Sequence, residues 1–336
     1  MSSDAQRIVL AARPKGKATA SDFRIETVEI PVAGAGQILL RTLYLSLDPY
    51  MRGRMDDRKS YAKPVAVGDV MEGESVAEVI ASGRSDYAPG EIVLARTGWQ
   101  THSVSDGKGL RKLNQALAPI TTGLGVLGMP GFTAYGGMRV IGQPKRGETV
   151  AVAAATGPVG SLVGQLAKRA GARAVAIAGG PEKCAFARDA FGFDAAIDHR
   201  DAEFAKQLAN ACPQGIDVYF ENVGGRIWQA VLPLLNKFAR VPVCGLIAQY
   251  QGSLGTSDQL PATMRQVLSK SLTLRGFINN EFADLYPEFL EEVGAGVRSG
   301  AIRYREDIVD GLANAPEAFL GMLEGRNFGK LLVKVR

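Results

Sequence analysis

A glycine-rich turn at residues 153–160 is the segment of this sequence best suited to bind phosphate. It reads A-A-A-T-G-P-V-G and lies between an apolar strand pattern and a helical pattern. Ala155, Gly157 and Gly160 occupy the three positions of a G-x-G-x-x-G fingerprint, with alanine at the first. Gly157 lets a pyrophosphate approach the backbone, and Gly160 lets the following helix pack closely on the strand. The turn therefore predicts a dinucleotide site at the positive end of a helix.

The hydrogen-bond donors of this turn are limited by Pro158, which has no N–H group. Thr156 and the amides around Val159 must therefore donate to the phosphates. A tight strand-to-helix turn that binds no ligand is the alternative. The position of the turn inside a strand–helix–strand unit favours dinucleotide binding.

The choice between NAD and NADP is decided at the end of the next strand pattern. An NAD enzyme usually has an acid there, which accepts a hydrogen bond from the ribose 2′-hydroxyl. Here residues 178–183 read A-G-G-P-E-K. Gly180 and the glycine before it cannot repel a 2′-phosphate, Lys183 can pair with it, and His199 with the following arginine can close the other side. Glu182 is expected to face solvent, so the segment favours NADP, although Lys183 could also be an ordinary exposed helix lysine.

The elements that must position these residues are of two kinds. Short strand patterns occupy the first 120 residues, at 24–30, 37–44, 74–81 and 91–95. They predict an irregular antiparallel barrel. Later in the chain, strand patterns at 149–154, 174–178, just before 198, 217–220, 239–244 and 272–277 alternate with helical patterns at 159–169, 182–191, 202–211 and 228–235. This alternation predicts an α/β domain with a doubly wound parallel sheet.

The domain boundaries follow from this change of pattern. We expect one domain from residues 1–127 and 302–336, because the last strand pattern, at 330–335, returns to the first domain. We expect the nucleotide-binding domain at residues 128–301.

The composition excludes several classes of protein. The 336 residues are 46% hydrophobic and 22% charged, which excludes a mainly disordered or coiled-coil chain. The net charge of +5 is spread without a run of five like charges, so no nucleic-acid partner is expected. Glycine and proline interrupt the two long uncharged stretches, 113–138 and 149–167, so no membrane span is expected. The N-terminus lacks the apolar segment of a secretory signal, and a cytoplasmic protein is expected.

A zinc enzyme is disfavoured by the inventory of metal-binding side chains. The only cysteines are Cys184, Cys212 and Cys244, and their spacing matches no zinc motif. There are two histidines, His102 and His199. The odd number of cysteines is typical of reduced thiols in the cytosol.

Seven stretches of the chain, in family order, resemble the zinc-free medium-chain dehydrogenase/reductases, and within them the leukotriene 12-hydroxydehydrogenase and prostaglandin reductase group with the alkenal and bacterial curcumin reductases. They are L-S-L-D-P-Y-M-R-G-R-M (45–55), M-P-G-F-T-A-Y (129–135), A-A-A-T-G-P-V-G (153–160), A-G-G-P-E-K-C (178–184), F-E-N-V-G-G (220–225), V-C-G-L-I-A-Q-Y (243–250) and N-F-G-K (327–330). The resemblance implies a GroES-like barrel domain with a Rossmann domain. It also implies a homodimer joined through the edge strand at 272–277.

The resemblance implies reduction of an activated C=C bond in an α,β-unsaturated aldehyde or ketone. NADPH would give a hydride to the β-carbon without a metal, and negative charge would develop on the carbonyl oxygen. Tyr250 is the predicted catalytic donor to that oxygen, and it is also expected beside the cofactor. Where the family often has asparagine after this tyrosine, Gln251 stands here. The alternative is that Tyr250 only packs against the nicotinamide.

Two further residues are predicted to bind substrate. By the resemblance, Tyr50 of D-P-Y-M-R forms a wall of the substrate cleft, with a purely structural anchor as the alternative. Phe277, at the end of the sixth strand pattern, is either a neighbour of the nicotinamide or part of the core.

Four more residues are expected near the cofactor. The resemblance makes Asn222 and Asn327 cofactor ligands, although an asparagine before two glycines can simply form a turn. Thr133 is expected to start a helix, where it either binds the nicotinamide amide or is an ordinary helix-start threonine. Cys244 is expected at the end of the fifth strand near the nicotinamide, with no visible means of acting as a nucleophile.

Two other functions remain open. Distant zinc-free relatives reduce quinones, and others are non-catalytic NADPH-binding proteins that serve as lens crystallins or RNA binders. The D-P-Y-M-R and N-F-G-K motifs favour the double-bond reductase, and Tyr250 argues against a non-catalytic role. Which enone or enal is reduced does not follow from the sequence.

Overall fold

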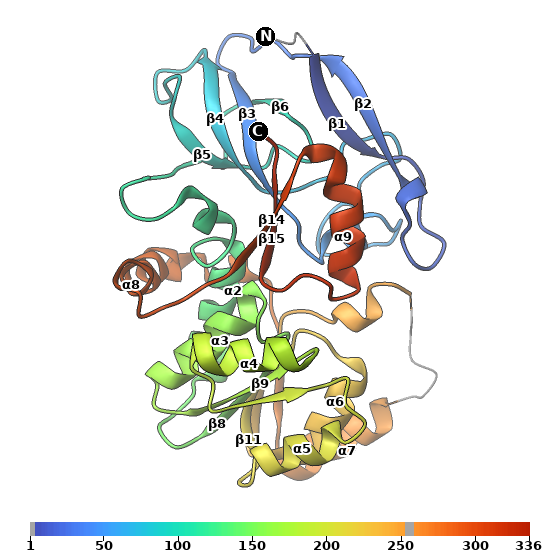
Figure 1. Cartoon of the computed structure of the whole chain (residues 1–336), viewed down its shortest axis with the longest axis vertical. Coiled ribbons are helices and arrows are strands. Elements are labelled where there is room, and N and C mark those ends of the chain that lie inside the picture. The colour runs from blue at the N-terminus through green and yellow to red at the C-terminus, as the bar shows by residue number, and fades with distance from the viewer. Residues whose placement is uncertain (1–3, 253–258) are drawn as a thin grey trace. The chain divides into compact units, whose positions relative to one another are not determined.

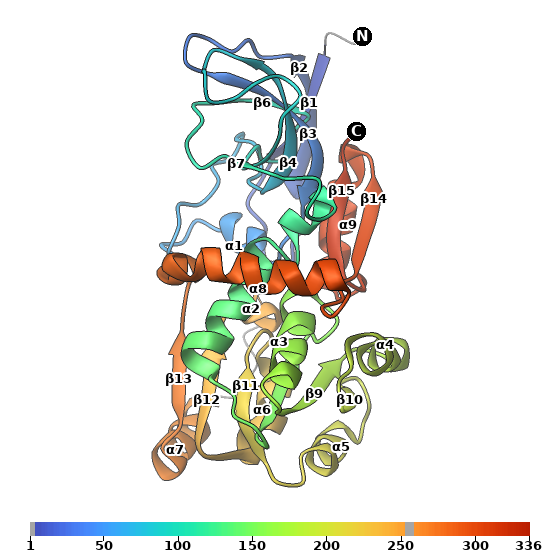
Figure 2. The same cartoon turned by 90° about the vertical axis from the view of Figure 1, so that its left-hand side faces the viewer.

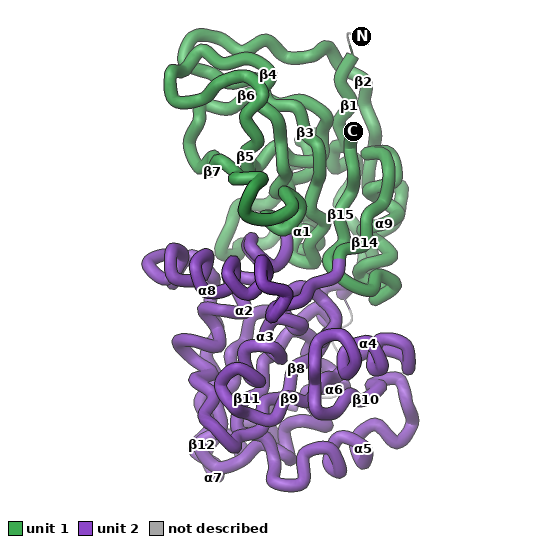
Figure 3. Tube along the Cα trace, turned by 60° about the vertical axis from the view of Figure 1, so that its left-hand side comes forward, with its two compact units in different colours: residues 1–124, 306–336 green, residues 125–305 purple. Residues whose placement is uncertain are grey.

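The chain divides into two compact units in the computed structural model, which describes residues 4–252 and 259–336 (Figures 1 and 3). Unit 1 comprises residues 1–124 and 306–336, and unit 2 comprises residues 125–305. The boundaries expected from the sequence were 127/128 and 301/302.

Unit 1 is built mainly from antiparallel strands. Its main sheet has the order β14-β15-β3-β4-β5-β7, with β6 paired to β3. The strands are β3 (Ile38–Ser46), β4 (Ser75–Ser82), β5 (Ile92–Ala95), β6 (His102–Ser105), β7 (Arg111–Lys112), β14 (Glu306–Asp310) and β15 (Lys330–Lys334). β1 (Asp4–Leu10) and β2 (Phe23–Glu29) form a separate antiparallel pair. The predicted antiparallel first domain is confirmed, with an exception at β14.

The exception is that β14 runs parallel to β15. Helix α9 (Ala315–Leu323) connects the two strands, and a helical crossover of this kind returns the chain in the same direction. β14 reads E-D-I-V-D, which is too polar to stand out as a strand in the sequence.

Unit 2 contains six parallel strands in the order β10-β9-β8-β11-β12-β13. They are β8 (Thr149–Ala153), β9 (Arg173–Ala178), β10 (Ala195–Asp198), β11 (Ile216–Phe220), β12 (Leu235–Val243) and β13 (Thr273–Gly276). Within the sheet this is the doubly wound order 3-2-1-4-5-6, so that prediction is confirmed. The order reverses between β8 and β11, and the carboxyl ends of those strands form the switch point where such sheets bind ligands.

Helices cover both faces of this sheet (Figure 2). They are α2 (Met129–Gly136), α3 (Pro158–Arg169), α4 (Pro181–Phe191), α5 (Phe204–Ala211), α6 (Gly225–Val231), α7 (Leu260–Lys270) and α8 (Tyr286–Ser299). Because side chains alternate along a strand, Val150 and Val152 pack under α2, α3 and α8, whereas Ala151 and Ala153 pack under α5 and α6. Among the helices of the described residues, none has both the length and the apolar character that a membrane crossing needs.

One predicted helix is wrong in its extent. The pattern at 228–235 predicted a single helix, but α6 ends at Val231, a 3-10 turn covers Leu232–Leu234, and β12 begins at Leu235. Pro233 accounts for the change, because proline cannot donate the next helical hydrogen bond.

Candidate active site

The glycine turn after β8 has the backbone geometry of a phosphate-binding loop. Ala154 has a φ of 52°, and Gly157 caps α3 in an extended conformation. A Cβ at Gly160 would lie 2.4 Å from the carbonyl oxygen of Ala154, so only glycine fits there. A Cβ at Gly164 would lie 2.0 Å from the ring of Phe193. Both glycines are needed for packing, and cofactor contact at this turn stays a prediction.

The start of α3 offers donors in the predicted place. Pro158 is its first residue, and Thr156, two residues earlier, is buried. The N–H groups of the first turn, including that of Val159, have no acceptor within the helix. They are therefore suited to an anion at the carboxyl end of β8.

Basic side chains surround the glycines after β9. A Cβ at Gly179 would lie 3.0 Å from Nε2 of His199 and 3.0 Å from Nε of Arg200. Gly180 has a φ of 97°, a conformation that favours glycine. The Asp198 carboxylate accepts hydrogen bonds of 2.9 Å from the N–H groups of Gly180 and Arg200, and so holds both segments in place.

Positive charge at this corner comes from arginine and lysine. Burial, together with the charge of Arg200, lowers the pKa of His199 below its ordinary value. A neutral imidazole at pH 7 can add a hydrogen bond but not a charge. Lys183 is half-buried in the first turn of α4, whereas Glu182 is exposed, as expected. The structure thus brings together the glycines and cations that the NADP interpretation requires.

The side chains of Asn222 and Cys244, both predicted to lie near the cofactor, form a hydrogen bond with each other. The amide nitrogen of Asn222 donates to the carbonyl oxygen of Ala153 over 2.9 Å. Its amide oxygen accepts from the Cys244 thiol over 2.8 Å. The side chain therefore links the carboxyl ends of β8, β11 and β12, and a contact of Asn222 with the cofactor stays a prediction.

The Cys244 thiol acts as a hydrogen-bond donor here. Burial, and then the negative charge of Glu221, raises the pKa of Cys244 far above its ordinary value. A thiol held in its protonated form is a poor nucleophile.

Tyr250 folds back over the turn that follows β12. Its hydroxyl oxygen accepts a hydrogen bond of 3.3 Å from the N–H of Leu246. A Cβ at Gly245 would lie 3.3 Å from the same oxygen. The hydroxyl therefore lies at the carboxyl end of β12, on the sheet edge that also carries Asn222 and the glycine turn.

Thr133 is not at a helix start, so that expectation is wrong. α2 begins at Met129, with Gly128 as its N-cap and Pro130 in its first turn. Proline in the first turn fixes the start of the helix four residues before the threonine. The hydroxyl of Thr133 donates to the carbonyl oxygen of Met129 over 2.8 Å.

Phe277 lies in the hydrophobic core of unit 2. Its side chain is buried, with ring centroids 6.2 Å from Phe220 and 5.5 Å from Phe282. β13 ends one residue earlier, at Gly276. Of the two roles left open by the sequence, these contacts favour the core.

A buried ion pair in unit 1 joins the D-P-Y-M-R and N-F-G-K motifs. Nζ of Lys330 lies 2.6 Å from Oδ1 of Asp48 and donates to the carbonyl oxygen of Leu47 over 2.9 Å. The Ser46 hydroxyl donates to the other oxygen of Asp48. Lys330 is only 2% exposed. The sequence signal for this pair was a lysine directly before the apolar run Leu331–Val333.

Tyr50 follows this ion pair and caps the short helix α1 (Met51–Arg54). It is half-buried, and the Arg54 guanidinium lies 5.5 Å from its ring centroid. Burial, and then the negative charges of Asp48, Glu72 and Glu74, raises the pKa of Tyr50 far above its ordinary value. The phenol therefore keeps its proton at physiological pH and can donate.

Asn327 also lies in unit 1. Its amide nitrogen donates to the carbonyl oxygen of Gly329 over 2.8 Å, which shapes the turn into β15. A contact with the cofactor at this position stays a prediction.

Family models match both halves of the chain. Residues 6–113 match the model described as the N-terminal domain of oxidoreductase, and residues 158–294 match the model described as zinc-binding dehydrogenase. The chain is 51% identical to the NADPH-dependent curcumin reductase of Escherichia coli (strain K12), over 98% of this chain and 96% of the relative. It is 38% identical to the NADP(+)-dependent 2-alkenal reductase of Nicotiana tabacum, over 98% and 97%.

The chain belongs to the alkenal and curcumin reductase group of the medium-chain dehydrogenase/reductases. The crystal structure of CurA in complex with NADPH from Vibrio vulnificus agrees, with 51% identity, a TM-score of 0.94, and coverage of 98% of this chain and 99% of that one. Despite the description of the second family model, no group of three or more metal-binding side chains lies within residues 4–252 and 259–336.

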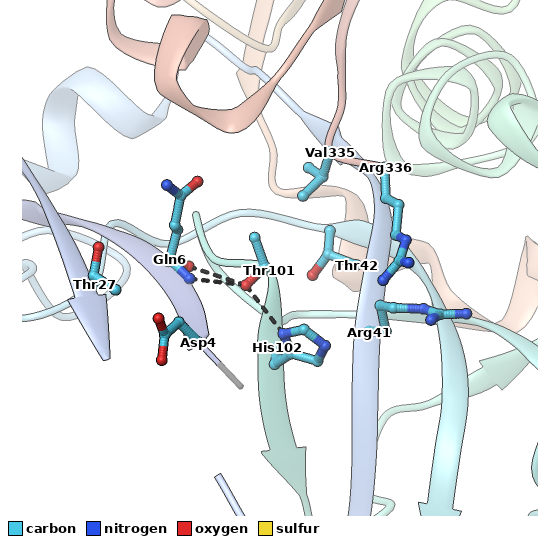
Figure 4. Close-up of a pocket in the computed structure, with 9 residues that line it drawn as sticks. All are labelled: Asp4, Gln6, Thr27, Arg41, Thr42, Thr101, His102, Val335 and Arg336. Atoms are coloured by element: carbon cyan, nitrogen blue, oxygen red, sulfur yellow. Dashed lines mark hydrogen bonds between the residues drawn. The ribbon is translucent and has the colours of Figure 1, made fainter. Parts of the chain in front are cut away.

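A cavity in unit 1 is lined by no residue of the D-P-Y-M-R or N-F-G-K motif (Figure 4). It has a volume of about 370 Å³ and is lined by residues of β1, β2, β3 and β6 and by Val335 and Arg336. Arg41 and Arg336 line it together with Asp4 and His102. Arg41 is already paired with Glu78. Opposite charges offset one another there, and none of the residues predicted for the active site lines the cavity.

The first prediction concerns Arg200. If the arginine binds the 2′-phosphate, Arg200→Ala should raise the KM for NADPH roughly 10- to 100-fold, because one charge-assisted contact is lost. The KM for NADH, which has no 2′-phosphate, should change little. Steady-state kinetics with both cofactors measures this, and Arg298→Ala, at an exposed arginine in α8, is the control. Equal losses with both cofactors would exclude a phosphate contact.

The second prediction concerns the buried pair in unit 1. Lys330→Met should lower the free energy of unfolding by about 3–5 kcal/mol, because Asp48 would remain buried without its cation. Urea denaturation measures the change. Adding Asp48→Asn to Lys330→Met should recover part of the lost free energy of unfolding. Lys206→Met, which breaks an exposed 3.8 Å pair with Glu203, should change the free energy by less than about 0.5 kcal/mol.

Proposed function

We propose that this protein reduces the C=C bond of α,β-unsaturated aldehydes and ketones with NADPH. The observation that carries the proposal is the full-length similarity to an NADPH-dependent curcumin reductase at 51% identity. Curcumin and 2-alkenals share a C=C bond conjugated to a carbonyl group. The glycines after β9 and Arg200 after β10 agree with NADPH as the reductant.

We propose that unit 2 holds the cofactor. Its phosphates would bind at Thr156, Gly157, Val159 and Gly160, where the helix start provides N–H donors. The 2′-phosphate would lie against Gly180, with Lys183, His199 and Arg200 around it. At the nicotinamide end we place Thr133, Asn222, Cys244 and Tyr250. Bound NADPH supplies a hydride.

Tyr250 is proposed as the donor to the carbonyl oxygen of the substrate. Hydride addition at the β-carbon places negative charge on that oxygen, and a proton then reaches the α-carbon, so that the product gains two hydrogen atoms. A donor aimed at the developing charge lowers the barrier. The Leu246 N–H bonds to the hydroxyl oxygen of Tyr250 and so orients it.

Unit 1 is proposed as the GroES-like catalytic domain. Tyr50 would form a wall of the substrate cleft. Its phenol keeps its proton, and the adjacent ion pair of Asp48 and Lys330 fixes the turn that carries it.

The test of the function is NADPH oxidation with purified protein and a panel of substrates. The panel contains 2-alkenals, curcumin, chalcone-like enones, oxo-prostaglandins and quinones. Mass spectrometry should find the saturated carbonyl compound from an enone. Turnover of quinones alone would favour the quinone reductase alternative. NADPH binding without any turnover would favour a non-catalytic protein, and a salt-dependent RNA shift assay would then test RNA binding.

The third prediction is that Tyr250→Phe lowers kcat by about 100-fold, because a donor to the reacting oxygen is lost. The Kd for NADPH, measured by fluorescence, should stay near the wild-type value because the ring remains. Tyr304→Phe is the control for loss of a partly buried tyrosine hydroxyl in unit 2. An unchanged kcat in Tyr250→Phe would mean that the tyrosine only packs in the site.

We further propose a homodimer joined along β13. This strand is the edge of the parallel sheet, and all four of its residues are exposed. Helix α7, which packs on β12, exposes an apolar stripe at helical spacing: Leu260 is 63% exposed, Met264 55% and Leu268 83%. An uncovered edge and stripe of this kind usually mark an interface.

The fourth prediction follows from this stripe. Met264→Glu with Leu268→Glu should convert a dimer to a monomer, because two charges would be buried at the interface. Light scattering after size-exclusion chromatography measures the mass. The exposed apolar residue Val32 in unit 1 provides a control, Val32→Glu. A wild-type protein that is already monomeric would refute the dimer.

We place the protein in the cytoplasm. Its three cysteines are free thiols in the structure, which agrees with a reducing compartment.

A further inference from the structure

A buried acid follows β11, and the proposed chemistry has no use for it. Glu221 is the residue after the strand and is only 2% exposed. A carboxyl group in such a place costs free energy unless hydrogen bonds compensate. Burial raises the pKa of Glu221 above its ordinary value, although the N–H groups around it act in the opposite direction.

The side chain of Glu221 holds the loop that follows it. Its Oε1 accepts hydrogen bonds from the N–H groups of Val223 over 2.7 Å and Gly224 over 2.8 Å. The Tyr219 hydroxyl donates to the same oxygen over 3.1 Å. Gly224 and Gly225 have φ values of 75° and 58°, so the backbone here curls in a way that favours glycine.

The main chain of Glu221 holds a second segment, the one that follows β12. Its N–H donates to the carbonyl oxygen of Pro242 over 2.9 Å. Its carbonyl oxygen accepts from the N–H groups of Cys244 over 3.0 Å and Gly245 over 3.3 Å. One residue therefore connects the ends of two neighbouring strands.

The loop shaped by Glu221 in turn supports the segment that carries Tyr250. The N–H of Ile247 donates to the carbonyl oxygen of Asn222 over 3.2 Å, and the N–H of Ala248 donates to that of Val223 over 3.0 Å. The N–H of Tyr250 donates to the carbonyl oxygen of Ile247 over 3.2 Å. These contacts form an unbroken series from the Glu221 carboxyl group to the tyrosine.

We propose that Glu221 is a positioning residue, which shapes the 222–225 loop through Oε1 and thereby fixes the 244–250 segment and the hydroxyl of Tyr250. The inference rests on the proposed role of Tyr250 in the reduction. Glu221 itself touches neither substrate nor cofactor in this proposal.

The test compares three variants with the wild type by kcat, by KM and by the Kd for NADPH. Glu221→Leu removes the acceptor and should lower kcat by up to about 100-fold, the scale of a misplaced catalytic group. Glu221→Gln keeps a carbonyl acceptor of the same shape and should restore much of the activity. Val218→Ala, in the core on the same strand, is the control for lost stability. Val218→Ala should keep the wild-type kcat even if its melting temperature falls as far as that of Glu221→Leu.

A double-variant cycle decides whether Glu221 acts through the tyrosine. Glu221→Leu combined with Tyr250→Phe should be no slower than Tyr250→Phe alone, because the same contribution can be lost only once. The inference would be overturned if the loss of kcat in the double variant were the product of the losses in the two single variants. It would also be overturned if Glu221→Leu had the same kcat as Val218→Ala.

Two other outcomes are separable from these. If Tyr250→Phe alone has the wild-type kcat, the proposed role of the tyrosine fails, whatever Glu221→Leu does. If Glu221→Leu does not fold, Glu221→Asp provides the test. It draws the acceptor back by one methylene group from the N–H groups of Val223 and Gly224, so it should lower kcat, and an unchanged kcat would overturn the inference.

Discussion

The amide of Asn222 is the contact on which the rest of the site depends. Parallel strands on the two sides of the switch point diverge into loops that run in opposite directions, and backbone pairing ends there. The Asn222 side chain bridges this gap, with its nitrogen on the carbonyl of Ala153 and its oxygen on the thiol of Cys244. The glycine turn, the β11 loop and the β12 segment are therefore held as one structure before any ligand binds.

Buried charge has a similar organising role in both units. Glu221 in unit 2 and the Lys330–Asp48 pair in unit 1 each bind main-chain groups as well as side chains. Such groups contribute little net stability, because desolvation offsets their attraction. What they specify is geometry, since a carboxylate or ammonium group that loses its partners is strongly penalised. Glu221 directly precedes Asn222, and Asp48 lies two residues before Tyr50.

The sequence predicted the layout of the fold and the class of cofactor, because both depend on local patterns. The strand–turn–helix pattern around Gly157 needs no knowledge of distant residues. Side-chain partners could not be predicted in the same way. The partner of Asn222 is 69 residues away, and that of Lys330 is 282 residues away. Thr133 and Phe277 were misplaced or left open for a related reason, because helix starts and burial depend on neighbours that pack only in the folded chain.

The hydrogen bond from the Leu246 N–H explains how the backbone can prepare Tyr250 for its proposed role. A hydroxyl that accepts a hydrogen bond becomes a stronger donor, because the two bonds polarise one another. The bond also fixes the oxygen while the proton rotates about the C–O bond toward a substrate. Any side chain at Gly245 would crowd the hydroxyl oxygen, at 3.3 Å from its Cβ. The absence of a side chain at that glycine is thus part of the same arrangement that holds the tyrosine ready to donate.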